Sequence, residues 1–194
     1  MKHVLIYIPG LGERYDQYRK RALRAWRIFG VEARLLPMNW YDGKSYEGKY
    51  DTASAVVASL LDDGVKVSLV GESAGGSMAI NLFANHPRVA NLITIAGVNT
   101  STAPVATTTL RRGPAFAISR QHVGPSLGSV PAQRRRHVHT LSGLRDDVVR
   151  WNDSHIEGAH NHRVFTIGHV MTIATCLTLF SGYVISLAKK TNSV

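Results

Sequence analysis

The sequence predicts an α/β fold, a three-layer sandwich with a mainly parallel sheet of about six strands and helices on both faces. Short, almost wholly apolar runs alternate with longer segments whose apolar residues recur every three to four positions. Strands without polar positions need cover on both faces, and the helices that connect parallel strands supply it. With 194 residues, 44% of them hydrophobic and 19% charged, we expect a single domain over 1–194.

Strand and helix segments alternate regularly through residue 97. Glycine closes the first two predicted helices, and His86-Pro87 stops the third. The predicted strands cover 3–9, 31–40, 65–71 and 89–97, and the predicted helices cover 13–29, 45–63 and 73–85. Active sites in such sheets lie beyond the carboxyl ends of the strands, so chemistry-bearing residues are sought there.

The alternation stops after Val98 and resumes near residue 136. Residues 99–133 are rich in Thr, Ser, Pro and Gly, and only 114–121 is expected to form a helical turn or two. We interpret this segment as a small lid, an excursion over the sheet or a loose loop. The remaining predictions are a strand at 136–143, a short helix within 148–156, a strand at 162–168 and a helix at 169–189.

The predicted last helix is unusually apolar, with no charged residue between 170 and 188. Its length alone makes it a transmembrane candidate. Small, mildly polar residues nevertheless recur along it opposite larger apolar ones; the two sets are Thr175, Thr178, Gly182 and Ser186, and Ile173, Leu177, Phe180, Val184 and Leu187. We therefore expect a packed amphipathic helix rather than a membrane span.

Lys and Arg outnumber Asp and Glu by 23 to 13, which gives a formal net charge of +10. Much of the excess lies in the predicted helix at 13–29, with apolar positions Tyr15, Tyr18, Leu23, Trp26 and Phe29 and basic positions Arg14, Arg19, Lys20, Arg21, Arg24 and Arg27. We interpret the basic residues as a solvated face and expect no nucleic-acid partner, since no zinc-finger or aromatic RNA-binding motif accompanies them. The single cysteine, Cys176, excludes an intramolecular disulfide and, with a first strand where a secretory signal would stand, favours a cytoplasmic protein.

The segment Gly71-Glu72-Ser73-Ala74-Gly75 joins a predicted strand to a predicted helix. A serine at such a turn sits in a strained conformation, flanked by small residues that let neighbouring chain pass close. The helix that follows directs its first N–H groups toward developing negative charge. A tight strand-helix turn in a non-catalytic protein has the same pattern, so partner residues must decide between the two interpretations.

A nucleophilic serine needs a base, and the base needs an orienting acid. In this architecture the acid and the histidine follow the serine along the chain. Asp146 and Asp147 come directly after one predicted strand, and His169 comes directly after the last one. Both positions are suitable for a Ser-Asp-His arrangement with Ser73.

With PGLG after the first strand, GESAGG, GLRDDVV and the GH before the last helix, the chain resembles a small serine esterase of the α/β-hydrolase superfamily. The resemblance implies that Ser73 is the nucleophile, His169 the general base and then acid, and Asp146 the residue that orients the imidazole. Asp146 is preferred over Asp147 because the family's acid loop usually places the aspartate three residues after a glycine, here Gly143.

The resemblance also implies an oxyanion hole made by the backbone amides of Leu11 and Ala74, with Gly10 and Gly12 shaping the substrate-binding turn. The chain departs from the common family pattern at Pro9, where a histidine often precedes the first glycine, and it lacks the HGGG motif of many GESAGG esterases. The esterase branch therefore cannot be assigned from the serine motif alone.

The activity implied is cleavage of a small-molecule ester or thioester without a cofactor or a metal, by a monomer or homodimer. His155, His160 and His162 lack an acidic or cysteine partner at useful spacing, so we interpret them as solvated loop residues rather than metal ligands. An open site is expected, with arginines of the 99–133 segment either solvated or available to an anionic group: Arg111, Arg112 and Arg120. The alternatives are a membrane-associated lipid hydrolase and a non-catalytic binding protein of the same fold.

Overall fold

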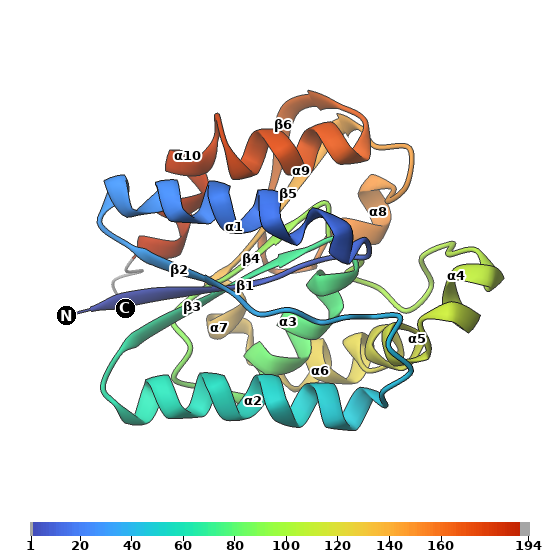
Figure 1. Ribbon diagram of the computed structural model, residues 1–194, viewed down its shortest axis with the longest axis horizontal. Coiled ribbons are helices and arrows are strands. Elements are labelled where there is room, and N and C mark those ends of the chain that lie inside the picture. The colour runs from blue at the N-terminus through green and yellow to red at the C-terminus, as the bar shows by residue number, and fades with distance from the viewer. Residues whose placement is uncertain (1, 191–194) are drawn as a thin grey trace.

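A sheet of six parallel strands forms the middle layer of the molecule (Figure 1). This computed structural model describes residues 2–190. The strands are β1 (His3–Ile8), β2 (Glu32–Leu35), β3 (Lys66–Glu72), β4 (Leu92–Ile95), β5 (Val138–Arg145) and β6 (His160–Ile167), and they lie side by side in the order β2-β1-β3-β4-β5-β6. Every neighbouring pair is parallel, which confirms the predicted sheet.

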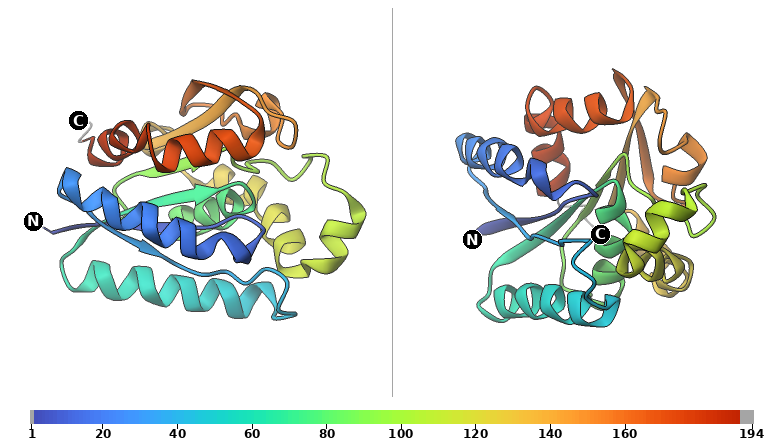
Figure 2. Two further views of the ribbon diagram at one scale, coloured as in Figure 1. Left: turned by 45° about the horizontal axis from the view of Figure 1, so that its top comes forward. Right: turned by 45° about the vertical axis from the view of Figure 1, so that its right-hand side comes forward.

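Helices cover both faces of the sheet, as predicted (Figures 1 and 2). The α-helices are α1 (Asp16–Ala25), α2 (Tyr46–Asp62), α3 (Ala74–Asn85), α4 (Thr107–Arg112), α5 (Pro114–Gln121), α6 (Val123–Ser129), α7 (Ala132–Arg135), α8 (Trp151–Ser154), α9 (His169–Leu177) and α10 (Ser181–Lys189). Two 3₁₀ helices, η1 (Glu13–Tyr15) and η2 (Trp26–Phe29), flank α1. One face carries α1, α9 and α10, and the other carries α2, α3, α5 and α6 (Figure 1).

Strand β1 explains why the predicted strands are apolar at successive positions. Successive side chains of a strand point to opposite faces of the sheet. Leu5 and Tyr7 pack with the side chains of α1 and α10, whereas Val4, Ile6 and Ile8 pack with those of α2 and α3. All five are at most 1% exposed, so both faces of this central strand are buried.

The strand order places a crevice at the carboxyl ends of β1 and β3. The chain leaves β1 for β2 on one side and then crosses back to β3 on the other, which makes the β1/β3 boundary a topological switch point. Connections that diverge from such a boundary leave a crevice between them. Because Ile8 is in register with Gly71, the turn after β1 lies beside the turn after β3.

Close packing of α3 against β1 and β3 depends on glycine. A Cβ atom added at Gly75 would lie 2.2 Å from the carbonyl oxygen of Ile8, and one at Gly71 would lie 2.7 Å from the Cβ of Ala79. Both distances are far below van der Waals contact, so a larger residue at either position would push α3 away from the sheet. The glycines of the GESAGG segment therefore have a packing role in addition to any catalytic one.

The 99–133 segment is more ordered than the sequence suggests. It contains three short helices, α4 to α6, and the start of a fourth, α7, where a helical turn was expected only at 114–121, the position of α5. Phe116 and Val123 are buried, and the Phe116 ring lies 5.9 Å from that of Trp40 in an edge-on arrangement. Since α5 and α6 contact α3, and α5 also contacts α2, the segment extends the helical layer on that face.

The prediction of one continuous helix at 169–189 is wrong. The structure has α9 and α10, which meet at an angle of 70°. The Trp26 indole donates a hydrogen bond of 2.9 Å to the carbonyl oxygen of Leu177, the acceptor that a continuous helix would offer to Ser181. Ser181 N–H instead donates to Thr178, 3.2 Å away. Within residues 2–190 no single helix meets the length and hydropathy required of a membrane span, although α9 and α10 together do.

Candidate active site

Ser73 lies at the turn between β3 and α3 in a strained conformation. Its φ of 50° and ψ of −119° place a non-glycine residue outside the regions that side chains favour. Hydrogen bonds hold the residue on both sides, because its N–H donates to Ile95 O at 2.9 Å and its carbonyl accepts from Val98 N–H at 2.9 Å. The surrounding strands thus impose the strain and leave the half-buried hydroxyl at the mouth of a pocket.

His169, the first residue of α9, lies between Ser73 and Asp146. The Ser73 hydroxyl is 2.9 Å from His169 Nε2, and Asp146 Oδ2 is 2.9 Å from His169 Nδ1. A carboxylate accepts hydrogen bonds, so the Nδ1 proton points at Asp146 and Nε2 is left to accept from the serine. The structure therefore brings the three predicted residues into one hydrogen-bonded chain.

The neighbouring residues Asp146 and Asp147 contact different parts of His169. Asp146 contacts the imidazole, and its Oδ1 also accepts hydrogen bonds of 2.8 Å from the amides of Val148 and Val149. Burial opposes ionisation of Asp146, but the hydrogen bonds from His169 and the two amides outweigh it and lower the pKa of this carboxyl. Asp147 accepts instead from the His169 backbone N–H at 2.9 Å, so it holds the first turn of α9.

Two backbone amides near Ser73 are free to donate a hydrogen bond to a ligand. Within residues 2–190, neither the Leu11 N–H nor the Ala74 N–H donates to a protein acceptor. Gly10 packs directly under the nucleophile, since a Cβ atom added there would lie 2.8 Å from the Ser73 Cβ, and Gly12 has a φ of 94° that favours glycine. Neither Gly10 nor Gly12 belongs to the pocket lining, so their contribution to this site is to the shape of the turn.

Several solved structures share this arrangement of strands and helices. Carboxyl esterase 2 from the mycorrhizal fungus Tuber melanosporum matches with a TM-score of 0.66 and 14% identity over 96% of this chain and 74% of that one. A structure of the metagenome-derived lipolytic enzymes LipS and LipT matches with a TM-score of 0.69 and 12% identity over 97% of this chain and 94% of that one. The ydeN gene product of B. subtilis matches with a TM-score of 0.62 and 19% identity over 98% of this chain and 100% of that one. The chain has the α/β-hydrolase fold. No family model and no curated protein matches it in sequence.

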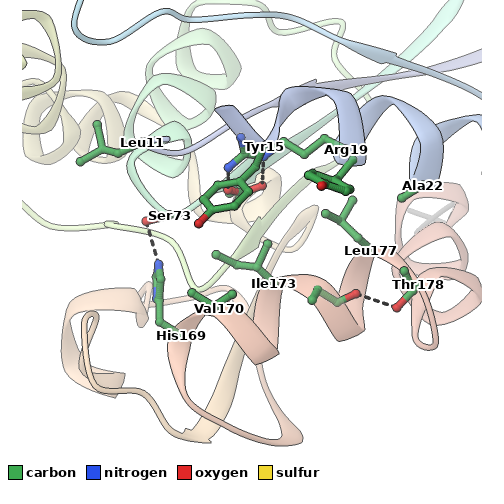
Figure 3. Close-up of a pocket in the computed structure, with 13 residues that line it drawn as sticks. Leu11, Tyr15, Arg19, Ala22, Ser73, His169, Val170, Ile173, Leu177 and Thr178 are labelled. Carbon is green, nitrogen blue, oxygen red and sulfur yellow. Dashed lines mark hydrogen bonds and ion pairs between the residues drawn. The ribbon is translucent and has the colours of Figure 1, made fainter. Parts of the chain in front are cut away.

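The pocket of this α/β-hydrolase-fold protein lies between α1 and α9 (Figure 3). Its volume is about 310 Å³, and its lining runs from Leu11, Ser73 and His169 to Ala22, Leu177 and Thr178. No residue of the 99–133 segment lines it. The side chain of Arg120 donates to Ser101 O, and that of Arg112 lies 5.0 Å from the ring centre of Tyr41.

The sequence interpretation missed a buried ion pair beneath Ser73. Arg19, assigned to a solvated face, has a side chain only 6% exposed, and it pairs with Glu72, which is 2% exposed. The other five basic residues of that helix are exposed. The sequence contained a signal for this burial. Arg19 is four residues before Leu23 and seven before Trp26, both buried, and therefore shares their helical face.

The Tyr7 hydroxyl completes this cluster by donating to Glu72 Oε2 at 2.6 Å. Burial, with the neighbouring charge of Glu72, raises the pKa of Tyr7 well above its ordinary value, so the phenol remains a donor. Tyr15 and Tyr18, expected to pack beside Leu23, are instead 45% and 67% exposed. Both line the pocket.

The histidines at the end of the chain lie on a strand rather than in a loop. His160 and His162 belong to β6, and both stack against the buried His139 of β5. Burial, with the neighbouring histidine and lysine charges, lowers the pKa of His139 to about 3, so its ring is neutral. Among residues 2–190 no group of three or more His, Cys, Asp or Glu side chains is arranged to hold a metal ion.

Proposed function

We propose that the protein is a serine hydrolase that cleaves carboxylic esters, or thioesters, through an acyl-enzyme. The observation that carries the proposal is the continuous hydrogen-bonded chain from Ser73 through His169 to Asp146, at the mouth of a pocket. The structural neighbours include a carboxyl esterase and lipolytic enzymes, which agrees with this class of reaction. A non-catalytic binding protein would have no need of the strained, partly exposed serine.

In the first half of the reaction Ser73 Oγ attacks the substrate carbonyl carbon while His169 Nε2 takes the hydroxyl proton. The negative charge of Asp146 stabilises the imidazolium that results. The carbonyl oxygen becomes an oxyanion, which we assign to the free N–H groups of Leu11 and Ala74. The intermediate then collapses, the bond to the leaving group breaks, and His169 returns the proton to the departing alcohol or thiol.

The second half repeats these steps with water. His169 Nε2 takes a proton from a water molecule, whose oxygen attacks the acyl carbon of the Ser73 ester. Collapse of this second tetrahedral intermediate breaks the bond to Ser73 Oγ, which recovers the proton from His169. The products are one carboxylic acid and one alcohol or thiol, and no redox step occurs.

A direct test is to incubate the purified protein with p-nitrophenyl acetate and, separately, with a fluorophosphonate probe. We expect steady release of p-nitrophenol and a single covalent adduct on the peptide that contains Ser73, identified by mass spectrometry. Release of p-nitrophenol without labelling of Ser73, or labelling at another serine, would contradict the proposed mechanism. Cytoplasmic location and a monomeric or dimeric state remain predictions.

A further inference from the structure

The pocket beside Ser73 has two walls from opposite ends of the chain (Figure 3). One wall is formed by Tyr15 of η1 with Tyr18 and Ala22 of α1, and the other is α9, with Val170, Ile173 and Leu177. Figure 3 shows Ser73 and His169 at one end and Ala22 and Thr178 at the other. A group bonded to a carbonyl at Ser73 would therefore extend along the groove between the two helices.

Among the described residues that line the pocket, the charged side chains of Arg19 and Glu72 pair with each other. The lining of the pocket is apolar apart from Ser73, His169, Thr178, the tyrosines and the pair formed by Arg19 and Glu72. That pair is saturated, because Arg19 Nε donates to Glu72 at 2.9 Å and its terminal nitrogens donate to Glu72, Gly12 and Asp16. An anionic or strongly polar group would lose its hydration here without finding a partner.

We infer that this pocket binds an apolar hydrocarbon chain of the ester, and that the end formed by Ala22 and Thr178 limits the length of that chain. The inference rests on the proposed function. Pockets for small ligands usually measure about 300–1,000 Å³. With about 310 Å³, this one accommodates a short to medium chain rather than a long fatty acid.

The test measures kcat/KM for two ester series, p-nitrophenyl esters of increasing acyl length and alkyl acetates of increasing alcohol length. Each methylene that the pocket buries should raise kcat/KM roughly fourfold until the pocket is filled. The series that shows the rise identifies whether the acyl or the alcohol side occupies the pocket. A flat profile in both series, with acetate esters still hydrolysed, would overturn the subsite and leave the proposed function intact.

A matched pair of variants localises the effect. Ala22→Leu fills the end of the pocket and should lower the ratio of kcat/KM for the longest accepted ester to kcat/KM for p-nitrophenyl acetate by roughly tenfold. Ala25→Leu makes the same change on an exposed position of the same helix and should leave both values unchanged. Equal profiles for the two variants would contradict the assignment of Ala22 to the chain-binding pocket.

A second inference rests on the buried pair of Arg19 and Glu72, which joins the two turns of the site. Glu72 is the residue before Ser73, and its Oε1 lies 3.3 Å from the Gly10 N–H that donates to it. Arg19 donates to the carbonyl oxygen of Gly12 at 2.9 Å. The peptide group of Leu11 is thus held between two anchored neighbours.

We propose that Arg19 and Glu72 are positioning residues, which hold the Leu11 N–H toward the carbonyl oxygen of a substrate bound at Ser73. A hydrogen-bond donor stabilises an oxyanion only when it is held in place before the charge develops. The Glu72 carboxylate holds Gly10 on one side of the turn, and the Arg19 guanidinium holds Gly12 on the other. Arg19 is also paired with Glu72, which directly precedes Ser73. The pair therefore couples the oxyanion turn to the serine turn.

Glu72→Gln retains size but replaces a carboxylate oxygen with a donor that faces the guanidinium. We expect kcat to fall by roughly ten- to a hundredfold, up to the loss seen when one oxyanion donor is removed, with KM within about threefold of wild type. The affinity for phenylboronic acid, which forms a tetrahedral adduct with an active-site serine, should fall by the same factor as kcat. Arg19→Lys is the second variant. It should lose activity because lysine cannot bind Gly12 and Glu72 together, but the loss should be smaller than in Glu72→Gln.

Lys49→Met is the control, since it breaks another ion pair, between the buried Lys49 and the exposed Asp42, away from the site. All variants are compared at a temperature where circular dichroism shows them folded. Hydrogen exchange at the Gly10 amide, which donates to Glu72, should accelerate in Glu72→Gln and not in Lys49→Met, a result that does not depend on activity. Unchanged exchange in this turn, or a kcat equal to that of wild type, would overturn the positioning role.

Discussion

Replacement of Ser73 by alanine is expected to abolish ester hydrolysis. Removal of the nucleophile from a complete Ser-His-Asp arrangement lowers kcat by roughly 10⁶-fold, because the base and the acid have no hydroxyl to activate. In this protein Ser73 provides the only contact that His169 Nε2 makes among the hydrogen bonds of residues 2–190. The measurement is the initial rate of p-nitrophenyl acetate hydrolysis, with the protein concentration raised until the variant rate can be separated from background.

Ser77→Ala is the matched control for this variant. Ser77 lies one turn further along α3, where its hydroxyl donates to Ala74 O at 2.8 Å and is 2.9 Å from that of Ser119. Its loss should lower the melting temperature and leave kcat within about threefold of wild type, because it removes a structural hydrogen bond. A Ser73→Ala variant that retains more than a small fraction of the wild-type rate would mean that another group is the nucleophile.

Replacement of Asp146 by asparagine is expected to lower kcat by roughly 10⁴-fold with little change in KM. An asparagine amide presents a donor to His169 Nδ1, which favours the tautomer that has its proton on Nε2 and cannot accept from Ser73. The imidazolium formed in the reaction also loses its neighbouring negative charge. The loss corresponds to about 5 kcal/mol of transition-state stabilisation, measured as the change in kcat/KM.

Asp147→Asn tests whether the effect belongs to Asp146 alone. An asparagine at 147 keeps an oxygen that can accept from the His169 N–H, the bond that Asp147 makes at 2.9 Å. The carboxylate at 147 is exposed and has no contact with the imidazole ring among the hydrogen bonds of the described residues. We expect kcat within about threefold of wild type. Equal losses for the two variants would contradict the assignment of Asp146 as the orienting acid.

The strands and most helices could be predicted because their signals are local. Each predicted strand is present in the structure, and the glycines or His86-Pro87 end the predicted helices near the observed positions. The same local signals placed Ser73, Asp146 and His169 beyond strand ends. The helix break at Thr178 could not be predicted, because its cause is an indole from Trp26, 151 residues away from Leu177 in the chain.

By itself the sequence determined the alternation of strands and helices, the parallel sheet and the three residues that meet at its carboxyl edge. The reason is that helix period, strand period and turn chemistry depend on near neighbours in the chain. Only the tertiary structure decided that the pocket lies between α1 and α9 and that Arg19 is buried against Glu72. Both depend on which side chains meet in space after the sheet has formed, here across separations of 53 residues and more.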